Sequence, residues 1–127
     1  MITTTIDRPA ASRSRALTVA VWIAQLALAV LFLMAGSSKL LGAPQMVQSF
    51  EAIGLGQWFR YATGGIEVVS AVLLLAPGLA LFGALALIAT MIGAILTHLF
   101  LIGGSPILPI VLLVAASFVA LVRWRRA

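Results

Sequence analysis

The sequence predicts an all-α integral membrane protein: a four-helix transmembrane bundle with a short interfacial amphipathic helix between helices 1 and 2. Hydrophobic residues make up 63% of the 127 residues and charged residues only 9%, whereas a soluble domain carries about 25% charged residues. The apolar residues fall into four long runs, and a membrane span needs roughly 20 residues. We therefore expect the chain to lie mainly within the lipid bilayer.

The positive charges predict how the chain is oriented. The formal net charge is +5, and six arginines lie near the two chain ends: Arg8, Arg13, Arg15, Arg123, Arg125 and Arg126. Lys and Arg are retained on the cytoplasmic side of membranes, so we expect four spans with both termini in the cytoplasm. Aromatic residues are not interleaved with these arginines on a basic face, so nucleic acid is not an expected partner.

The first span is predicted at residues 16–38, after a disordered cytoplasmic tail at residues 1–15. A signal peptide is the competing interpretation, although its apolar region should be about 7–15 residues and the run from Ala16 to Ala35 is longer. One face of the span should look into the bundle, because its residues recur at spacings of three and four. It carries Gln25, Ala29, Phe32, Gly36 and Lys39.

The connection between the first two spans contains the predicted interfacial helix. Pro44 suits a first helical turn and Gly54 a C-terminal cap. The apolar residues between them share one face, which is typical of helices that lie in the membrane interface. This face carries Met46, Val47, Phe50 and Ile53, and the aromatic residues Trp58, Phe59 and Tyr61 would anchor the segment beside it.

The other three spans are predicted at residues 61–76, 79–102 and 107–122, so the transmembrane domain covers 16–124 and a basic cytoplasmic tail covers 125–127. In the second span, the face of Thr63, Glu67, Ser70 and Leu74 should pack against neighbouring helices. The third span carries a stripe of small residues at Gly83, Ala86, Thr90, Gly93 and Thr97. Small residues let helices approach closely in membranes.

Three ionisable side chains are predicted to meet in the outer half of the membrane. At a rise of 1.5 Å per residue, Glu67 lies roughly 9 Å and His98 about 6 Å from the outer ends of their spans. Lys39 ends the first span on the same side, and Gln25 lies deeper on the Lys39 face. Because charge in lipid is costly, we take Glu67, His98, Lys39 and Gln25 as candidate ligand-binding residues. The alternative is that they only hold the helices together.

Other kinds of site are not expected from this composition. The chain has no cysteine, one histidine and three acidic residues, which excludes thiol redox chemistry and iron–sulfur ligation by this chain and makes a metal site improbable. The sequence contains no nucleophile–base set and no cofactor motif. We therefore expect no autonomous enzyme, although a subunit of a quinone-linked oxidoreductase stays open.

Several short motifs in a fixed order resemble the DoxX-like family of small four-helix bacterial membrane proteins. They are Leu31–Leu40, Gly64–Glu67, Leu73–Pro77 and Met91–His98, and the resemblance covers about Trp22 to Trp124. It implies a multi-pass protein of the bacterial inner membrane, and the family name comes from a membrane subunit of a quinone-linked, sulfur-oxidising oxidoreductase. The family provides no firmly assigned catalytic residues to transfer.

Three functions follow from these observations. The first is a redox-associated accessory subunit that binds a quinone-like lipophilic ligand in the outer half of the bundle, with quinone as its non-covalent cofactor. The second is a transporter of a small lipophilic molecule. The third is a structural subunit that docks a membrane redox partner without any ligand.

Overall fold

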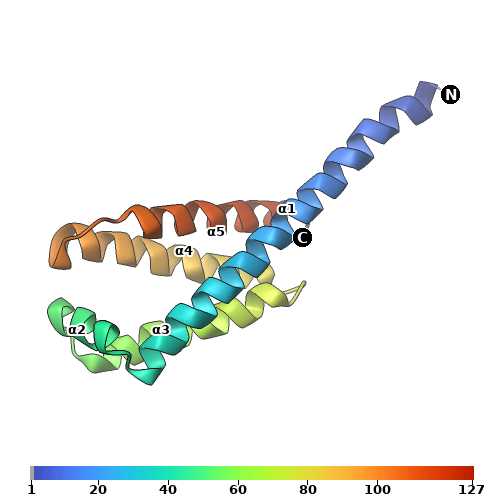
Figure 1. Ribbon diagram of the computed structural model, residues 1–127. Helices are drawn as coiled ribbons and strands as arrows, with labels where there is room; N and C mark the ends of the chain where they lie inside the picture. Colours follow the sequence, from blue (N-terminus) through green and yellow to red (C-terminus); the bar gives the residue numbers. More distant parts are fainter. Residues whose placement is uncertain (1) are drawn as a thin grey trace.

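The structure, a computed structural model, describes the backbone of residues 2–127 and the side chains of residues 12–127. Over that part the chain forms five α-helices and a short π-helical segment. These are α1 (Ile2–Leu41), α2 (Pro44–Ile53), α3 (Gln57–Leu75), α4 (Ala80–Thr97), η1 (His98–Ile102) and α5 (Ile107–Arg125). The predicted all-α architecture with a short helix between the first two spans is confirmed (Figure 1).

Four segments are long and apolar enough to cross a membrane, namely Ser12–Leu41, Gln57–Leu75, Ala80–Ile102 and Ile107–Arg125. All four include large hydrophobic side chains that are exposed, such as Val30, Val69, Phe82 and Val114. Such side chains on every span are expected for a bundle whose outer surface meets lipid rather than water.

The helix α1 begins earlier than the first span predicted from the sequence. It continues unbroken through Ser12–Arg15, a stretch predicted to belong to a disordered tail. This stretch contains no glycine or proline, and Arg126 donates hydrogen bonds to the Ser14 carbonyl (3.2 Å) and the Thr18 hydroxyl (2.7 Å). The described backbone is helical from Ile2, and Met1 lies outside the described residues.

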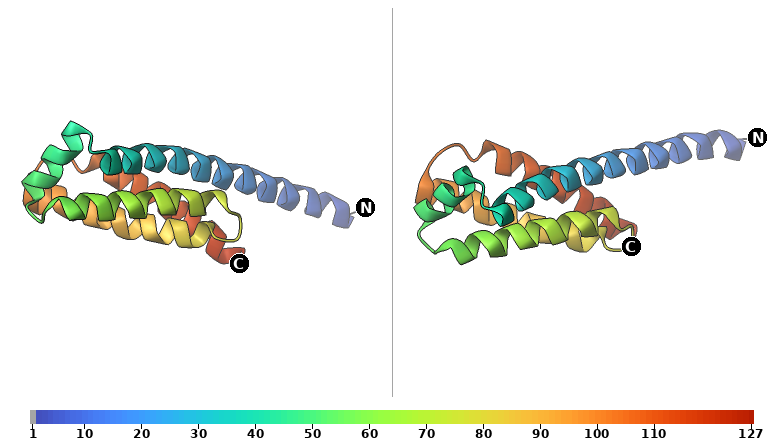
Figure 2. Two further views of the ribbon diagram at one scale, coloured as in Figure 1. Left: turned by 90° about the horizontal axis from the view of Figure 1, so that it is seen from below. Right: turned by 60° about the horizontal axis from the view of Figure 1, so that its bottom comes forward.

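The helices form a ring in which α3 packs against both α1 and α4, and α5 packs against α4 and α1 (Figure 2). The core between them consists of apolar side chains from all four spans. Its largest fully buried members are Leu28, Leu74, Leu87, Val21 and Val119. The predicted inner face of α1 is confirmed, because Gln25, Ala29 and Phe32 are at most 2% exposed.

The buried face of α4 differs from the predicted stripe of small residues. It consists of Ala80, Gly83, Ala84, Leu87 and Met91. Only Gly83 of the predicted stripe is fully buried, and a Cβ there would lie 2.7 Å from the Ser70 carbonyl oxygen of α3. Gly93 faces outward with no atom near its missing side chain. The helix is apolar all round, so its small residues do not by themselves identify its inner face.

The short helix α2 lies at the end of the bundle opposite the chain termini, against α3, η1 and α1 (Figure 2). As predicted, Pro44 occupies its first turn and Gly54 caps it in a left-handed conformation (φ 85°). Phe50 is buried and packs against Phe59 of α3, with the ring centroids 5.7 Å apart and the rings tilted by 60°. Gln57 also donates a hydrogen bond to the Val47 carbonyl, so side chains on both helices fix α2 to the start of α3.

Candidate functional site

The candidate site is built where α1 and α3 cross through two glycines. A Cβ on Gly36 would lie 2.8 Å from the Gly64 carbonyl oxygen, and a Cβ on Gly64 would lie 2.9 Å from the Lys39 Cβ. The two backbones are therefore in direct contact, as in small-residue crossings of membrane helices. Lys39 and Glu67 each follow their glycine by three residues, so this crossing brings their side chains together.

Lys39 and Glu67 form an ion pair inside the bundle. The Lys39 Nζ lies 3.1 Å from each of the two Glu67 carboxylate oxygens. The Glu67 side chain is 3% exposed and that of Lys39 is 14% exposed. An ammonium group has three donors, so the two contacts with the carboxylate leave one N–H of Lys39 for another acceptor.

Arg60 extends this polar cluster towards α2. It is 5% exposed, its Nε donates a 2.7 Å hydrogen bond to the Gln57 side chain, and its Nη1 donates to the Lys39 carbonyl. Its guanidinium also lies 4.3 Å from the centre of the Tyr61 ring. The last carbonyls of a helix lack partners within the helix and favour a cation. Arg60 thus caps the C-terminal end of α1.

His98 does not join the cluster. It begins η1 at the end of α4, and its Nδ1 lies 2.9 Å from the Gly103 carbonyl oxygen of the following loop. Among the described residues, no hydrogen bond or ion pair links His98 to Glu67 or Lys39. The predicted depth of Glu67 was counted from Tyr61, whereas α3 begins at Gln57, so Glu67 lies about 15 Å from the start of its helix instead of 9 Å.

Gln25 belongs to a second polar cluster, at the end of the bundle where the chain terminates. Its amide donates a 2.7 Å hydrogen bond to the Leu74 carbonyl, and its oxygen accepts a 2.6 Å hydrogen bond from the Arg123 Nε. The Arg123 guanidinium lies 5.2 Å from the centre of the Trp22 ring. Gln25 shares a face with Lys39, as predicted, but interacts with a different set of residues.

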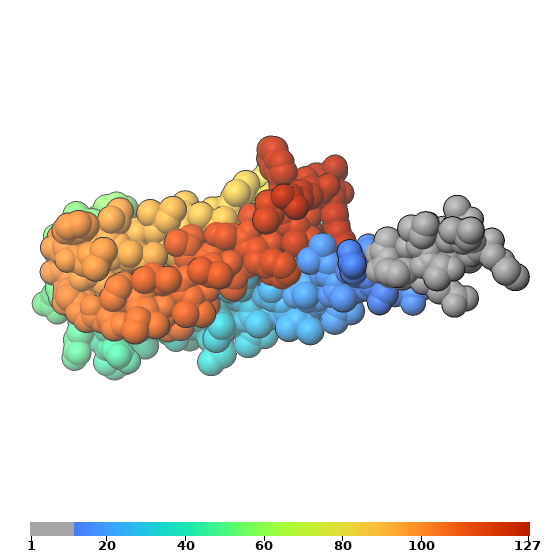
Figure 3. Space-filling model, turned by 90° about the horizontal axis from the view of Figure 1, so that it is seen from above, coloured from blue at the N-terminus to red at the C-terminus, as the bar shows by residue number. Residues whose placement is uncertain are grey.

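A groove between α1 and α5 lies in the same half of the bundle as the ion pair. Its volume is about 330 Å³, at the lower end of the range for small-molecule sites. Its wall is apolar apart from the Ser38 hydroxyl, which donates to the Met34 carbonyl. The lining residues are Leu31, Phe32, Met34, Ala35, Ser38, Leu108 and Leu112. Figure 3 shows α5 along one face of the bundle, with α1 emerging beside it.

Arg60 and Arg123 were not predicted as parts of buried clusters, because both stood at predicted span ends where arginine usually meets water or lipid head groups. The burial of Arg60 could have been predicted from its spacing relative to the other buried residues of α3. Arg60, Gly64, Glu67, Ala71 and Leu74 recur at intervals of four and three residues, and all are buried on one face of α3. Beginning the span at Gln57 would have included Arg60 in that face.

No group of three or more metal-ligating side chains occurs among the described residues. The polar arrangement can neutralise charge inside the membrane and offer a donor to an oxygen atom, and the groove can hold an apolar body.

Comparison with known proteins agrees with these features. A family model described as the DoxX-like family matches residues 23–121. The match includes the second and third spans whole, the first span from residue 23 onward and the last span up to residue 121. It contains Gln25, Lys39, Arg60, Glu67 and His98. No curated protein and no solved structure matches the chain. The resemblance seen in the sequence is thus confirmed, and the chain is a multi-pass membrane protein of the DoxX-like family.

Proposed function

We propose that the protein is an accessory subunit of a quinone-linked redox system, and that it binds a quinone-like lipophilic molecule in the groove between α1 and α5. The groove is the observation that carries this proposal. It is apolar, about 330 Å³ in volume, and lies beside helices that meet lipid. A membrane-soluble molecule would reach it from the bilayer without crossing water.

The polar cluster supports a ligand with oxygen acceptors. Ser38 lines the groove directly before Lys39, and Phe32 lies two turns from Lys39 on the same face of α1. The unused N–H of Lys39 can donate to a head-group oxygen, while Glu67 keeps the ammonium paired. His98, at the same end of the bundle, remains a candidate for a second contact, with α2 lying against η1.

A structural subunit without ligand is the second candidate, and the closed geometry of the ion pair favours it. Lys39 and Glu67 satisfy each other inside the bundle, so their charges need no ligand for compensation. On this alternative the pair fixes the crossing of α1 and α3, and the groove is filled by lipid chains.

Mass spectrometry of the gently purified protein tests the proposal, with quinones extracted from the sample and quantified per chain. Ala35→Trp fills the groove, and Ala62→Trp adds the same side chain to an exposed position of α3. We expect quinone with the wild type and with Ala62→Trp, and its loss from Ala35→Trp.

Two results would reject quinone binding in the groove. One is the absence of quinone from wild-type protein purified from quinone-rich membranes. The other is equal quinone content in the two tryptophan variants. The involvement of the polar residues is tested separately: Glu67→Gln and His98→Asn should lower quinone retention if they contact the head group, and only thermal stability if they serve packing.

A further inference from the structure

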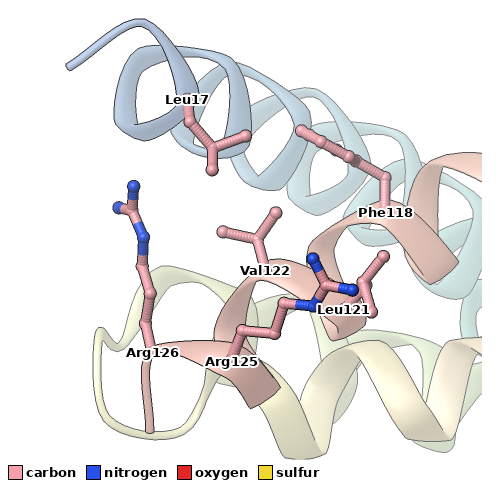
Figure 4. Close-up of a pocket in the computed structure, with 6 residues that line it drawn as sticks. All are labelled: Leu17, Phe118, Leu121, Val122, Arg125 and Arg126. Carbon is pink, nitrogen blue, oxygen red and sulfur yellow. The ribbon is translucent and has the colours of Figure 1, made fainter. Parts of the chain in front are cut away.

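A second cleft lies at the other end of the bundle, where α5 lies against α1 near Leu17. Its volume is about 190 Å³. Leu17 of α1 and Phe118, Leu121 and Val122 of α5 form its apolar wall, and Arg125 and Arg126 lie at its edge. Figure 4 shows Leu17, Phe118 and Val122 pointing toward one another, with both guanidinium groups beside them.

The arginines leave hydrogen-bonding capacity at the edge of this cleft. Arg125 is exposed and makes no hydrogen bond or ion pair with the described residues. Arg126 donates from its two terminal nitrogens to α1 and keeps further N–H groups free. The acidic side chains that the structure describes are Glu51 of α2 and Glu67 in the middle of α3, and neither forms an ion pair with these arginines. No described acidic side chain therefore competes for these guanidinium groups.

The cleft also lies at the level where the membrane surface is expected. Trp124 follows Arg123 on the outer side of α5 and is 68% exposed, and exposed tryptophans gather at the interface between lipid tails and head groups. An apolar wall on the lipid side and two cations on the water side match the two parts of a phospholipid. Guanidinium groups bind phosphate through paired, charge-assisted hydrogen bonds.

We propose that this cleft binds an anionic phospholipid of the surrounding bilayer, with its phosphate on Arg125 and Arg126 and the start of an acyl chain between Leu17, Phe118 and Val122. The apolar wall distinguishes this site from one for free phosphate, which would use the arginines alone. Basic pockets between transmembrane helices bind anionic head groups in this way. The inference is independent of quinone binding, which concerns the other end of the bundle.

Native mass spectrometry of the full chain tests this site, with phosphatidylglycerol and phosphatidylcholine of identical acyl chains added in turn. The wild type should retain phosphatidylglycerol in preference to phosphatidylcholine. Arg125→Gln removes a cation that makes no internal bond, and it should weaken phosphatidylglycerol binding about fivefold. Arg15→Gln is the matched control, because Arg15 is exposed and lies on the opposite face of α1 from Leu17. It should change binding less than about twofold, since salt screens distant charges.

Leu17→Trp fills the cleft and leaves both arginines in place, so it should also lower phosphatidylglycerol retention. Equal retention of the two lipids, or equal effects of Arg125→Gln and Arg15→Gln, would overturn the proposal in favour of general charge attraction. Unchanged retention in Leu17→Trp would show that no acyl chain enters the cleft. Displacement of the lipid by millimolar inorganic phosphate would show a phosphate site and overturn the lipid assignment.

Discussion

Replacing Gly64 with alanine tests whether the contact between α1 and α3 sets the geometry of the ion pair. A Cβ at this position would lie 2.9 Å from the Lys39 Cβ, 3.0 Å from the Gly36 carbonyl oxygen and 3.2 Å from the Leu40 Cγ. Non-bonded carbons prefer separations of about 3.5–4.0 Å. The Gly36 oxygen is part of the α1 backbone, and the Lys39 Cβ is bonded directly to that backbone. Neither atom can rotate away, so the two helices must separate by roughly half an ångström.

The expected cost follows from the closeness of these contacts. Extra methyl groups in well-packed cores typically lower the free energy of unfolding by about 1–3 kcal/mol. The higher helix propensity of alanine offsets up to about 1 kcal/mol of that loss. The neighbouring glycine separates the two effects, because a Cβ on Gly65 meets no atom within 4 Å. Gly65→Ala therefore changes helix propensity alone, and the difference between the two variants should be about 1–3 kcal/mol.

Reversible unfolding in mixed detergent micelles, followed by circular dichroism, measures this difference. Gly64→Ala should unfold at a lower fraction of denaturing detergent than Gly65→Ala. If the two variants unfold together, the backbones of α1 and α3 are not in contact at Gly64, and the glycine crossing is not what brings Lys39 to Glu67.

Three further predictions concern the buried clusters and the orientation. Lys39→Met should destabilise the protein by about 3 kcal/mol by leaving a buried carboxylate unpaired, and adding Glu67→Leu should restore much of that loss; additive losses in a double-mutant cycle would contradict a direct pair. Gln25→Leu removes a donor and an acceptor from buried partners and should cost about 1–3 kcal/mol in detergent unfolding; a neutral effect would mean that these partners are satisfied elsewhere. With the termini cytoplasmic, a cysteine at Gln48 should react with an impermeant maleimide from outside the cell membrane, and labelling from the cytoplasm alone would reverse the orientation.

The sequence was sufficient to predict the number of spans and the inner face of α1. Residues such as Gln25 and Lys39 are rare in apolar runs, and their helical spacing identified the face directly. In α4 the same reasoning failed, because Gly83 and Gly93 look alike in an entirely apolar helix. Only packing against Ser70 distinguishes them.

The partners of the polar residues were less predictable than their burial. Whether Lys39 or His98 is expected to reach Glu67 depends on where α3 is predicted to begin. An error of four residues in that start shifts the expected position of a side chain by about 6 Å along the helix axis. The spacing along α3 places Arg60 on the buried face, but it does not identify the Lys39 carbonyl at the end of α1 as its hydrogen-bond acceptor. Such contacts between distant segments leave no periodic signal in the sequence.

The helix α5 is attached to α1 by polar contacts at one end only. Arg123 and Arg126 bind α1 side chains and backbone near the chain terminus, whereas among the described residues no hydrogen bond joins the first turns of α5 to another span. A tilt of α5 about its terminal end would therefore widen the groove beside Leu108 and break only apolar contacts. The width of the groove beside Leu108 can therefore change without breaking a hydrogen bond of either polar cluster.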